Sequence, residues 1–399
     1  MKKRILVVAL LVMLAALSAG AMVGAQDEPV KIGMVSTLSG PASALGIDVR
    51  DGFLLAVEHM IEDGVIAEGD LEVLVSDDTQ SPDVAIQVVE EYIQRDEVDF
   101  VTGIIFSNIL LATSDTVFNA ETFLVSPNAG PSQLAGEDCN PFFFNAAWQN
   151  DNLHEAMGQY VTNEGFENVY ILAPDYPAGR DALTGFKRFY NGELADELYT
   201  QLGQLDFAVE MELIRASGAD AVFTFQPGGM GINFIKQYSE AGLIDEIPLF
   251  LPGFSADQDV INAVGDATIG LFNSSHWTLD LENDVNARFV ASFEETYERV
   301  PTLYASQGYD TALLIVSAIN AVEGDVADKD AVREALLAAD IASTRGDFSF
   351  NTNHYPIQNY YLRQVVQTED GDIINTTVGE PIFTEHTDAY AVDCAMGME

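Results

Sequence analysis

The chain of 399 residues is too long for one ordinary hydrophobic core, so its length predicts two domains. Its 63 acidic residues against 17 Lys and Arg give a net charge of -46 at pH 7, which argues against nucleic acid or anionic lipid as a partner. Two interpretations of this charge stay open, namely a solvated acidic surface of the kind adapted to salt and a surface for a charge-specific partner.

Residues 1–25 predict a signal peptide. A positive start at residues 2–4 precedes an apolar run at residues 5–17, and small residues stand before a cleavage point at Gln26. Because no second apolar run reaches membrane length, no direct membrane insertion is expected after cleavage. We therefore expect the mature protein to be periplasmic or extracellular.

Beyond the signal, short apolar runs alternate with stretches that carry apolar residues at helical spacing. In the first half, the expected strands are Lys31–Thr37, Leu71–Ser76, Asp99–Ile105 and Phe123–Ser126, and the expected helices are Asp48–Glu62, Asp83–Gln94 and Ile109–Asn119. Strands that alternate with helices imply right-handed crossovers and a parallel sheet, so the predicted fold class is α/β.

The same alternation restarts after a segment that we expect to be irregular, Gly136–Asn152. Here the expected strands are Asn168–Ala173, Asp220–Phe225 and Pro248–Leu251, and the expected helices are Gly179–Tyr190, Asp206–Ala216 and Gly231–Ala241. Near the C-terminus, alternating side chains predict strands at Phe348–Phe350 and Gln358–Gln364. Two successive α/β halves of similar layout are thus the main architectural prediction.

The chain contains two cysteines, Cys139 and Cys394. An oxidising compartment permits a disulfide, and two cysteines have one possible pairing. We expect this bridge, which would join the irregular segment to the C-terminal tail. The alternative is a pair of separate buried thiols.

Ligands of open parallel sheets bind beyond the carboxyl ends of the strands. Ser107 and Asn108 stand at the expected end of a strand and start of a helix, where free N–H groups and the helix dipole favour an anion. The same two residues could serve as a plain N-cap. The run from Asn128 through Ala129 to Gly130 could bring backbone near a ligand or form a turn, and Tyr176 and Phe254 could wall a pocket or pack between domains.

Enzymatic interpretations find little support. The G-x-S-x-G, G-x-x-x-x-G-K-[ST] and G-x-G-x-x-G signatures do not occur, so we expect no enzyme and no cofactor. No two histidines stand four residues apart, so no metal site is predicted and each is expected to be an ordinary surface or core residue: His59, His154, His276, His354 and His386.

Six segments resemble the type I periplasmic binding proteins of the branched-chain amino-acid transport family, which are solute-binding components of ABC importers: residues 31–46 (KIGMVSTLSGPASALG), 77–87, 123–134, 173–189 (APDYPAGRDALTGFKRF), 226–243 and 265–270. The resemblance implies two Rossmann-like lobes with parallel sheets, joined by a three-crossover hinge. It implies discontinuous lobes, with residues 27–146 plus about 278–351 in lobe 1 and 147–277 plus about 352–399 in lobe 2. It also implies ABC permease subunits as partners.

The resemblance further implies a ligand between the lobes. Ser107 matches a serine that binds the ligand carboxylate, and Leu45 falls where the family places a bulky side chain over the ligand. Ala129 and Gly130 match the loop of the first lobe that contacts the ligand. Tyr176 falls close to an aromatic contact of the second lobe, and three residues fall near two further contacts: Gln226, Pro227 and Tyr304.

Two departures from the family bear on the ligand. Gly253 stands where amino-acid binders carry the carboxylate that holds the ligand ammonium, and Gly130 replaces a hydroxyl residue. Since a buried ammonium without a partner is costly, we expect a small carboxylate without an amine, an aromatic or branched organic acid. The alternatives are a branched-chain amino-acid binder with a replacement carboxylate (from Asp175, Asp181 or Asp257) and a ligand-sensing receptor ectodomain.

Overall fold

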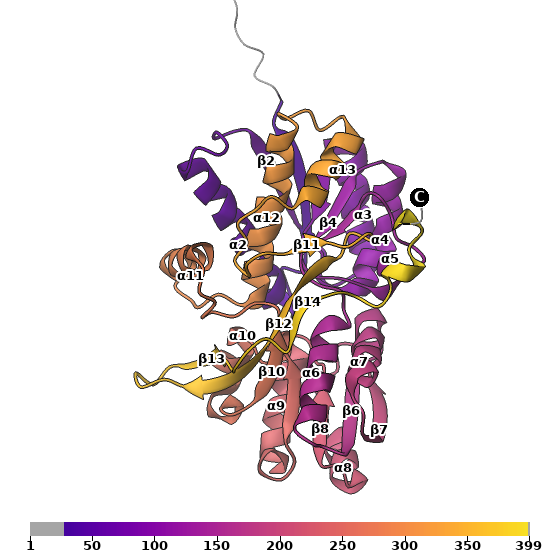
Figure 1. Cartoon of the computed structure of the whole chain (residues 1–399), viewed down its shortest axis with the longest axis vertical. Coiled ribbons are helices and arrows are strands. Elements are labelled where there is room, and N and C mark those ends of the chain that lie inside the picture. The colour runs from indigo at the N-terminus through magenta and orange to yellow at the C-terminus, as the bar shows by residue number, and fades with distance from the viewer. Residues whose placement is uncertain (1–27, 398–399) are drawn as a thin grey trace, which may run out of the picture.

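The computed structural model describes residues 28–397, so the predicted signal peptide lies outside the described residues. Within this range the chain forms two α/β lobes, which lie one above the other in Figure 1. None of the helices in residues 28–397 is both long and apolar enough to cross a membrane.

Lobe 1 is built on a parallel sheet with the strand order β2-β1-β3-β4-β5. Its strands are β1 (Val30–Ser36), β2 (Leu71–Asp77), β3 (Phe100–Thr102), β4 (Phe123–Ser126) and β5 (Phe143–Asn145). The helices that accompany them are α2 (Ser43–Glu62), α3 (Pro82–Glu91), α4 (Ser107–Asn119), α5 (Ser132–Ala135), α11 (Asp284–Tyr297), α12 (Leu303–Ala321) and α13 (Lys329–Ala338). The central strands are buried apolar runs, as expected for a sheet covered on both faces.

Lobe 2 is built on a second sheet, whose strand order is β11-β12-β10-β9-β8-β6-β7. Strands β13 and β14 also pair with β12. Its strands are β6 (Asn168–Pro174), β7 (Glu193–Thr200), β8 (Ala221–Thr224), β9 (Leu249–Pro252), β10 (Phe272–Ser275), β11 (Ser349–Phe350), β12 (Pro356–Gln367), β13 (Ile373–Thr377) and β14 (Phe383–His386). Its helices are α6 (Asn152–Asn163), α7 (Pro177–Phe189), α8 (Ala208–Ser217), α9 (Gly229–Glu240) and α10 (Gln258–Val264). Strands β6 to β10 are parallel, whereas β12 runs antiparallel to β10 and lies between β10 and β11.

The expected α/β alternation is confirmed, but the segment Gly136–Asn152 is not irregular throughout. It contains β5, the edge strand of the first sheet, which pairs with β4. Three residues are too short for a period to show in the sequence, so the strand could be recognised only through its partner. Strand β7 and the elements between residues 258 and 338 had no sequence-based prediction.

The expected strand Asp99–Ile105 is too long, and the expected helix Ile109–Asn119 starts too late. Strand β3 ends at Thr102 because Gly103 adopts a φ of +95°, which stops the extended conformation. A side chain at Gly103 would also meet Met34 Cγ at 2.7 Å. The chain then turns, and α4 begins at Ser107. This turn places Ser107 in the first turn of the helix.

Helices α2 and α12 cross with their backbones in contact. A Cβ atom on Gly52 would collide with the Ala305 carbonyl, and one on Gly308 would collide with the Val49 carbonyl. Glycine at both positions therefore permits this close approach. Because α2 carries Leu45 and α12 carries Tyr304, the crossing fixes the relative position of these two side chains.

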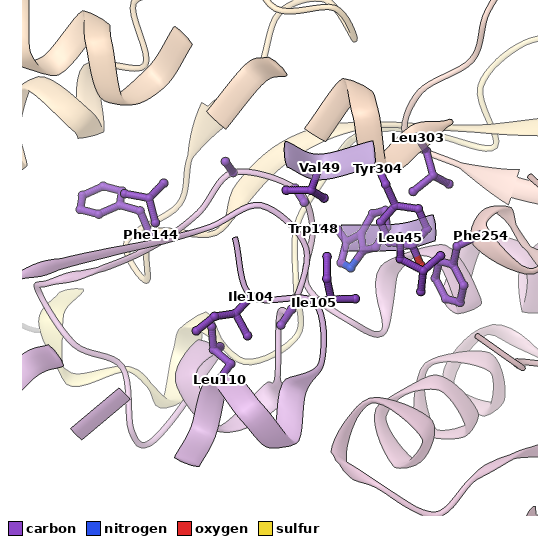
Figure 2. Close-up of a cluster of buried hydrophobic side chains, with 14 of the residues drawn as sticks. Leu45, Val49, Ile104, Ile105, Leu110, Phe144, Trp148, Phe254, Leu303 and Tyr304 are labelled. Atoms are coloured by element: carbon purple, nitrogen blue, oxygen red, sulfur yellow. The ribbon is translucent and has the colours of Figure 1, made fainter. Parts of the chain in front are cut away.

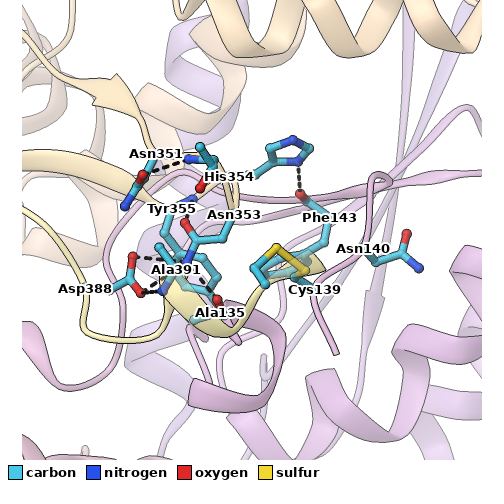
Figure 3. Close-up of a disulfide and its surroundings, with 12 residues drawn as sticks. Ala135, Cys139, Asn140, Phe143, Asn351, Asn353, His354, Tyr355, Asp388 and Ala391 are labelled. Atoms are coloured by element: carbon cyan, nitrogen blue, oxygen red, sulfur yellow. Dashed lines mark hydrogen bonds between the residues drawn. A yellow bond between two sulfur atoms is a disulfide. The ribbon is translucent and has the colours of Figure 1, made fainter. Parts of the chain in front are cut away.

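The predicted disulfide between Cys139 and Cys394 is confirmed (Figure 3). The two Cα atoms lie 5.6 Å apart across a sequence separation of 255 residues. Beside the bridge, the Asp388 carboxylate accepts hydrogen bonds from Asn353 Nδ2 at 3.1 Å and from the Tyr390 N–H at 2.8 Å. Asn353 Nδ2 also donates to the Ala135 carbonyl of lobe 1 at 2.8 Å, so the C-terminal tail is held to lobe 1 by the disulfide and, through Asn353, by hydrogen bonds.

Candidate ligand-binding site

A cavity of about 30 Å³ lies between the lobes, beyond the carboxyl ends of strands from both sheets. Its position is the one expected for a ligand of parallel sheets. The volume holds about two water molecules, so the lobes are closed around it. The lining residues are Leu45, Ile105, Phe106, Ser107, Asn128, Trp148, Asn150, His154, Tyr176, Ala178, Phe225, Pro227, Phe254 and Tyr304.

Aromatic rings of Phe, Tyr and Trp form a large part of the cavity wall. Phe254 packs against Phe225 with ring centroids 4.9 Å apart and against Trp148 at 5.7 Å. Phe106 of lobe 1 meets Tyr176 of lobe 2 at 6.3 Å, which joins the two lobes across the cavity. Figure 2 shows the Trp148, Phe254 and Tyr304 side chains gathered with Leu45. Such walls suit a flat, apolar ligand body.

Ser107 is the first residue of α4, and it is not an N-cap. The N-cap is Phe106, and no side chain caps the helix. The Ser107 hydroxyl oxygen instead accepts a hydrogen bond from Asn150 Nδ2 at 3.1 Å. Its own proton is therefore free to be donated. The Ile109 and Leu110 N–H groups donate to the Phe106 carbonyl at 3.0 Å, whereas the Ser107 and Asn108 N–H groups have no hydrogen-bond partner among the described residues. Together these donors form an end of the cavity that suits an anion.

Asn150 orients this end of the cavity. Its Oδ1 accepts the Gly130 N–H at 3.0 Å, while its Nδ2 donates to Ser107 and, at 2.9 Å, to the Asp181 carboxylate. Both ends of the amide are thus engaged, which fixes its orientation. Asn150 lies in the segment that was expected to be irregular, and nothing in the sequence indicated that it would orient Ser107.

The three acids considered as ammonium partners are engaged outside the cavity. Asp175 forms an exposed ion pair with Arg180 at 2.7 Å. Asp181 accepts the Ser132 N–H and hydroxyl, and burial raises the pKa of its carboxyl. Asp257 accepts the Leu303 N–H at 2.6 Å and lies 3.4 Å from Arg363 Nη1.

Gly253 has little room for a larger residue. A Cβ atom there would lie 2.8 Å from the Ser274 carbonyl oxygen and 2.9 Å from Arg363 Nη2. The local packing therefore does not accommodate the carboxylate that amino-acid binders carry at this position. None of the described side chains that line the cavity is Asp, Glu, Lys or Arg.

The structure brings together most of the site residues expected from the sequence, since the cavity is lined by Leu45, Ser107, Asn128, Tyr176, Pro227, Phe254 and Tyr304. Asn108, Ala129, Gly130 and Gln226 do not line it. The Gly130 N–H is taken by Asn150, and a Cβ atom on Gly130 would collide with the Trp148 carbonyl. The Gln226 side chain is turned to Thr224, with Nε2 at 3.3 Å from the hydroxyl.

Sequence reasoning missed Ile105, Phe106, Trp148, Asn150, His154, Ala178 and Phe225. Phe106 directly precedes the predicted site residue Ser107, and Phe225 directly precedes Gln226. Both could have been predicted from these neighbours. His154, expected to be an ordinary surface or core residue, lies in the cavity wall. Burial lowers its pKa to about 3, so the imidazole is neutral at neutral pH.

Residues 28–397 contain no cluster of three or more His, Cys, Asp or Glu side chains that could hold a metal ion.

Comparison with known proteins gives consistent matches. A family model described as periplasmic binding protein matches residues 29–372. The Leu/Ile/Val-binding protein homolog 6 of Brucella melitensis is 27% identical over 366 residues, covering 89% of this chain and 92% of the relative. The crystal structure of an ABC transporter solute-binding protein from R. palustris, in complex with benzoate, is 29% identical with a TM-score of 0.85, covering 92% of this chain and 99% of that one.

A second solved structure is similar over the same extent. It is a solute-binding protein of an ABC transporter from Rhodopseudomonas palustris BisB5, in complex with 3,4-dihydroxybenzoic acid. It is 26% identical with a TM-score of 0.82 and covers 91% of this chain and 99% of its own.

Proposed function

Because the chain belongs to the periplasmic binding protein family, we propose that it is the extracytoplasmic solute-binding component of an ABC importer, with permease subunits as its partners. The family implies a periplasmic location. The proposed ligand is a small carboxylic acid without an amine, with an aromatic or branched body. One observation carries this proposal: the cavity combines free donors at Ser107 and the start of α4 with a wall of aromatic rings and no charged side chain among its described lining.

Contacts between the lobes support capture by closure. Asp181 of α7 in lobe 2 accepts the Ser132 hydroxyl of lobe 1 at 2.7 Å, and the Gly229 N–H donates to the Pro41 carbonyl at 3.2 Å. Both bonds break when the lobes part, so they stabilise the closed form. We propose that the closing units are residues 27–146 with about 278–351 and residues 147–277 with about 352–399.

The ligand class is tested by competitive calorimetry with benzoate, 2-oxoisocaproate, leucine and phenylalanine. We expect at least one of the two acids to bind more tightly than both amino acids, because the acids near the cavity already have partners. Tighter binding of either amino acid would favour the second candidate, a branched-chain amino-acid binder.

Replacing Ser107 with Ala is expected to weaken binding of the acid about tenfold or more. The variant removes a hydroxyl whose proton is free for the ligand carboxylate, and hydrogen bonds to charged groups contribute about 1.5–3 kcal/mol. Titration calorimetry measures the change. Ser114→Ala is the matched control. It also removes a serine hydroxyl from α4, but this hydroxyl donates to the Leu111 carbonyl. Unchanged affinity in Ser107→Ala would exclude this serine as the anchor.

A further inference from the structure

Asn150 lies between β5 and α6, and its side-chain amide is held by partners that allow one orientation. The Gly130 N–H can only donate, and it meets Oδ1 at 3.0 Å. The ionised Asp181 carboxylate can only accept, and it meets Nδ2 at 2.9 Å. Turning the amide over would place its oxygen against the carboxylate and its nitrogen against the N–H group. Nδ2 is therefore fixed on the side that faces Ser107.

Asp181 is itself held in place by lobe 1. Ser132 donates to this carboxylate through its N–H at 3.0 Å and through its hydroxyl at 2.7 Å. Burial raises the pKa of Asp181, and the hydrogen bonds from Ser132 and Asn150 oppose this rise. Ser107, Asn150 and Asp181 are only 1%, 6% and 6% exposed, so bulk water does not compete for these contacts.

The fixed amide decides what the Ser107 hydroxyl can offer to a ligand. Its oxygen accepts from Asn150 Nδ2 at 3.1 Å, and among the described residues its proton has no acceptor. The Ser107 and Asn108 N–H groups beside it also have no partner within residues 28–397. This end of the cavity therefore presents donors. A ligand group with two acceptor oxygens pairs with them, whereas an N–H group of the ligand would face another donor.

We propose that Asn150 is a specificity-determining residue: it fixes Ser107 as a donor, so that the cavity selects a carboxylate over the neutral primary amide of the same acid. Asp181 is a positioning residue that acts through Asn150. This inference rests on the proposed function and deepens it, because it names the residues that distinguish the anionic group of the ligand. It concerns this group alone and applies equally to an aromatic and to a branched acid.

The first measurement is titration calorimetry of wild type with two matched pairs, benzoate against benzamide and 2-oxoisocaproate against its primary amide. Each amide keeps the body of its acid but replaces one acceptor oxygen with a donor. In at least one pair the acid is expected to bind about tenfold more tightly than its amide, or better, since a buried donor that faces another donor loses its partner. Equal binding within both pairs would overturn the inference.

The decisive variant exchanges the two side chains, Asn150→Asp together with Asp181→Asn, so that composition and net charge stay the same. An aspartate at position 150 can only accept, so Ser107 turns its proton toward it and presents lone pairs to the ligand. The ratio of acid affinity to amide affinity is expected to fall about tenfold or more below that of wild type. Asp181→Asn alone keeps an acceptor oxygen for Asn150 and is expected to retain the preference for the acid.

The exchange also brings a carboxylate nearer to the ligand, and Ser107→Ala separates this repulsion from the turned hydroxyl. In wild type, Ser107→Ala is expected to weaken acid binding about tenfold because the donated proton is lost. In the exchanged variant that proton already points to position 150, so the same change is expected to leave the acid affinity within about twofold. An equal loss in both backgrounds would mean that repulsion alone acts, and it would contradict the assignment.

The outcomes separate this inference from the function on which it rests. Failure of wild type to bind any acid would overturn both. Acid binding that depends on Ser107, but with a ratio that the exchange leaves unchanged, would overturn the inference alone. Asp175→Asn is the control, since it removes an exposed carboxylate of lobe 2 that pairs with Arg180, and it is expected to leave the ratio as in wild type.

Thermal denaturation shows whether the exchanged variant folds. If it does not, Asn150→Ala decides the question. Without Nδ2 the Ser107 hydroxyl can turn and either donate or accept, so the ratio of acid affinity to amide affinity is expected to fall. An unchanged ratio in Asn150→Ala would rule out the assigned role.

Discussion

Replacing Arg363 with Met is expected to lower the free energy of unfolding by about 3–5 kcal/mol, measured by urea denaturation at pH 7. Arg363 lies in β12 and is fully buried. Its guanidinium donates to Asn273 Oδ1 at 2.7 Å, to the Gly253 carbonyl at 3.0 Å and to the Asp257 carboxylate at 3.4 Å. The methionine fills similar space but leaves these acceptors, and above all a buried charge, without their donor.

The loss of unfolding free energy in Arg363→Met is expected to become smaller at acidic pH. Burial raises the pKa of Asp257, and Arg363 is the first of the influences that oppose the rise. Without the arginine, the native carboxyl binds its proton more readily than the unfolded one, so the loss of stability is largest above the native pKa and is relieved as the pH falls through it. Denaturation of Arg363→Met and wild type over a pH series checks this sign.

Arg215→Met is the matched control for this change. Arg215 is 40% exposed in its side chain and pairs with Glu246 at 3.3 Å on the surface. The same substitution there is expected to change stability by about 0.5 kcal/mol or less. Adding Asp257→Asn to Arg363→Met should recover part of the loss, because the buried charge is removed while an oxygen remains for the Leu303 N–H. Equal losses at Arg363 and Arg215 would contradict the argument.

Loss of the disulfide, by Cys139→Ser together with Cys394→Ser, is expected to cost about 2–5 kcal/mol of stability. The bridge closes a loop that spans a sequence separation of 255 residues, and long loops lose the most chain entropy when closed. Denaturation with and without reductant measures the effect. Reductant should destabilise wild type but leave the double variant unchanged, so an unaffected wild type, at proven reduction, would contradict the prediction.

The sequence predicted the alternation of strands and helices because each strand and helix carries its own period of apolar residues. It failed where structure depends on distant partners. Strand β5 is recognisable only beside β4, and the end of β3 depends on the backbone conformation of Gly103, which its one-letter code does not specify.

The candidate site divides in the same way. Strand ends such as Ser107 and Phe254 could be located because ligands of parallel sheets lie at that edge. Asn150 and His154 could not, since neither belongs to a recognisable strand end. Asn150 is tied to the site by its hydrogen bond to Ser107, and His154 by its packing against Phe225. The pairing of Asp257 with Arg363 likewise joins residues 106 positions apart.

The packing of α2 against α12 determines when lobe 1 can fold during synthesis. A chain made from its N-terminus releases α2 early, yet α12, whose Gly308 fits against the Val49 carbonyl, follows all the strands from β6 to β10. Until α12 emerges, a face of α2 stays without its cover and is available to chaperones. Lobe 1, which the ribosome begins first, therefore lacks α12 until the parallel strands of lobe 2 have been made, and Cys394 reaches Cys139 later still.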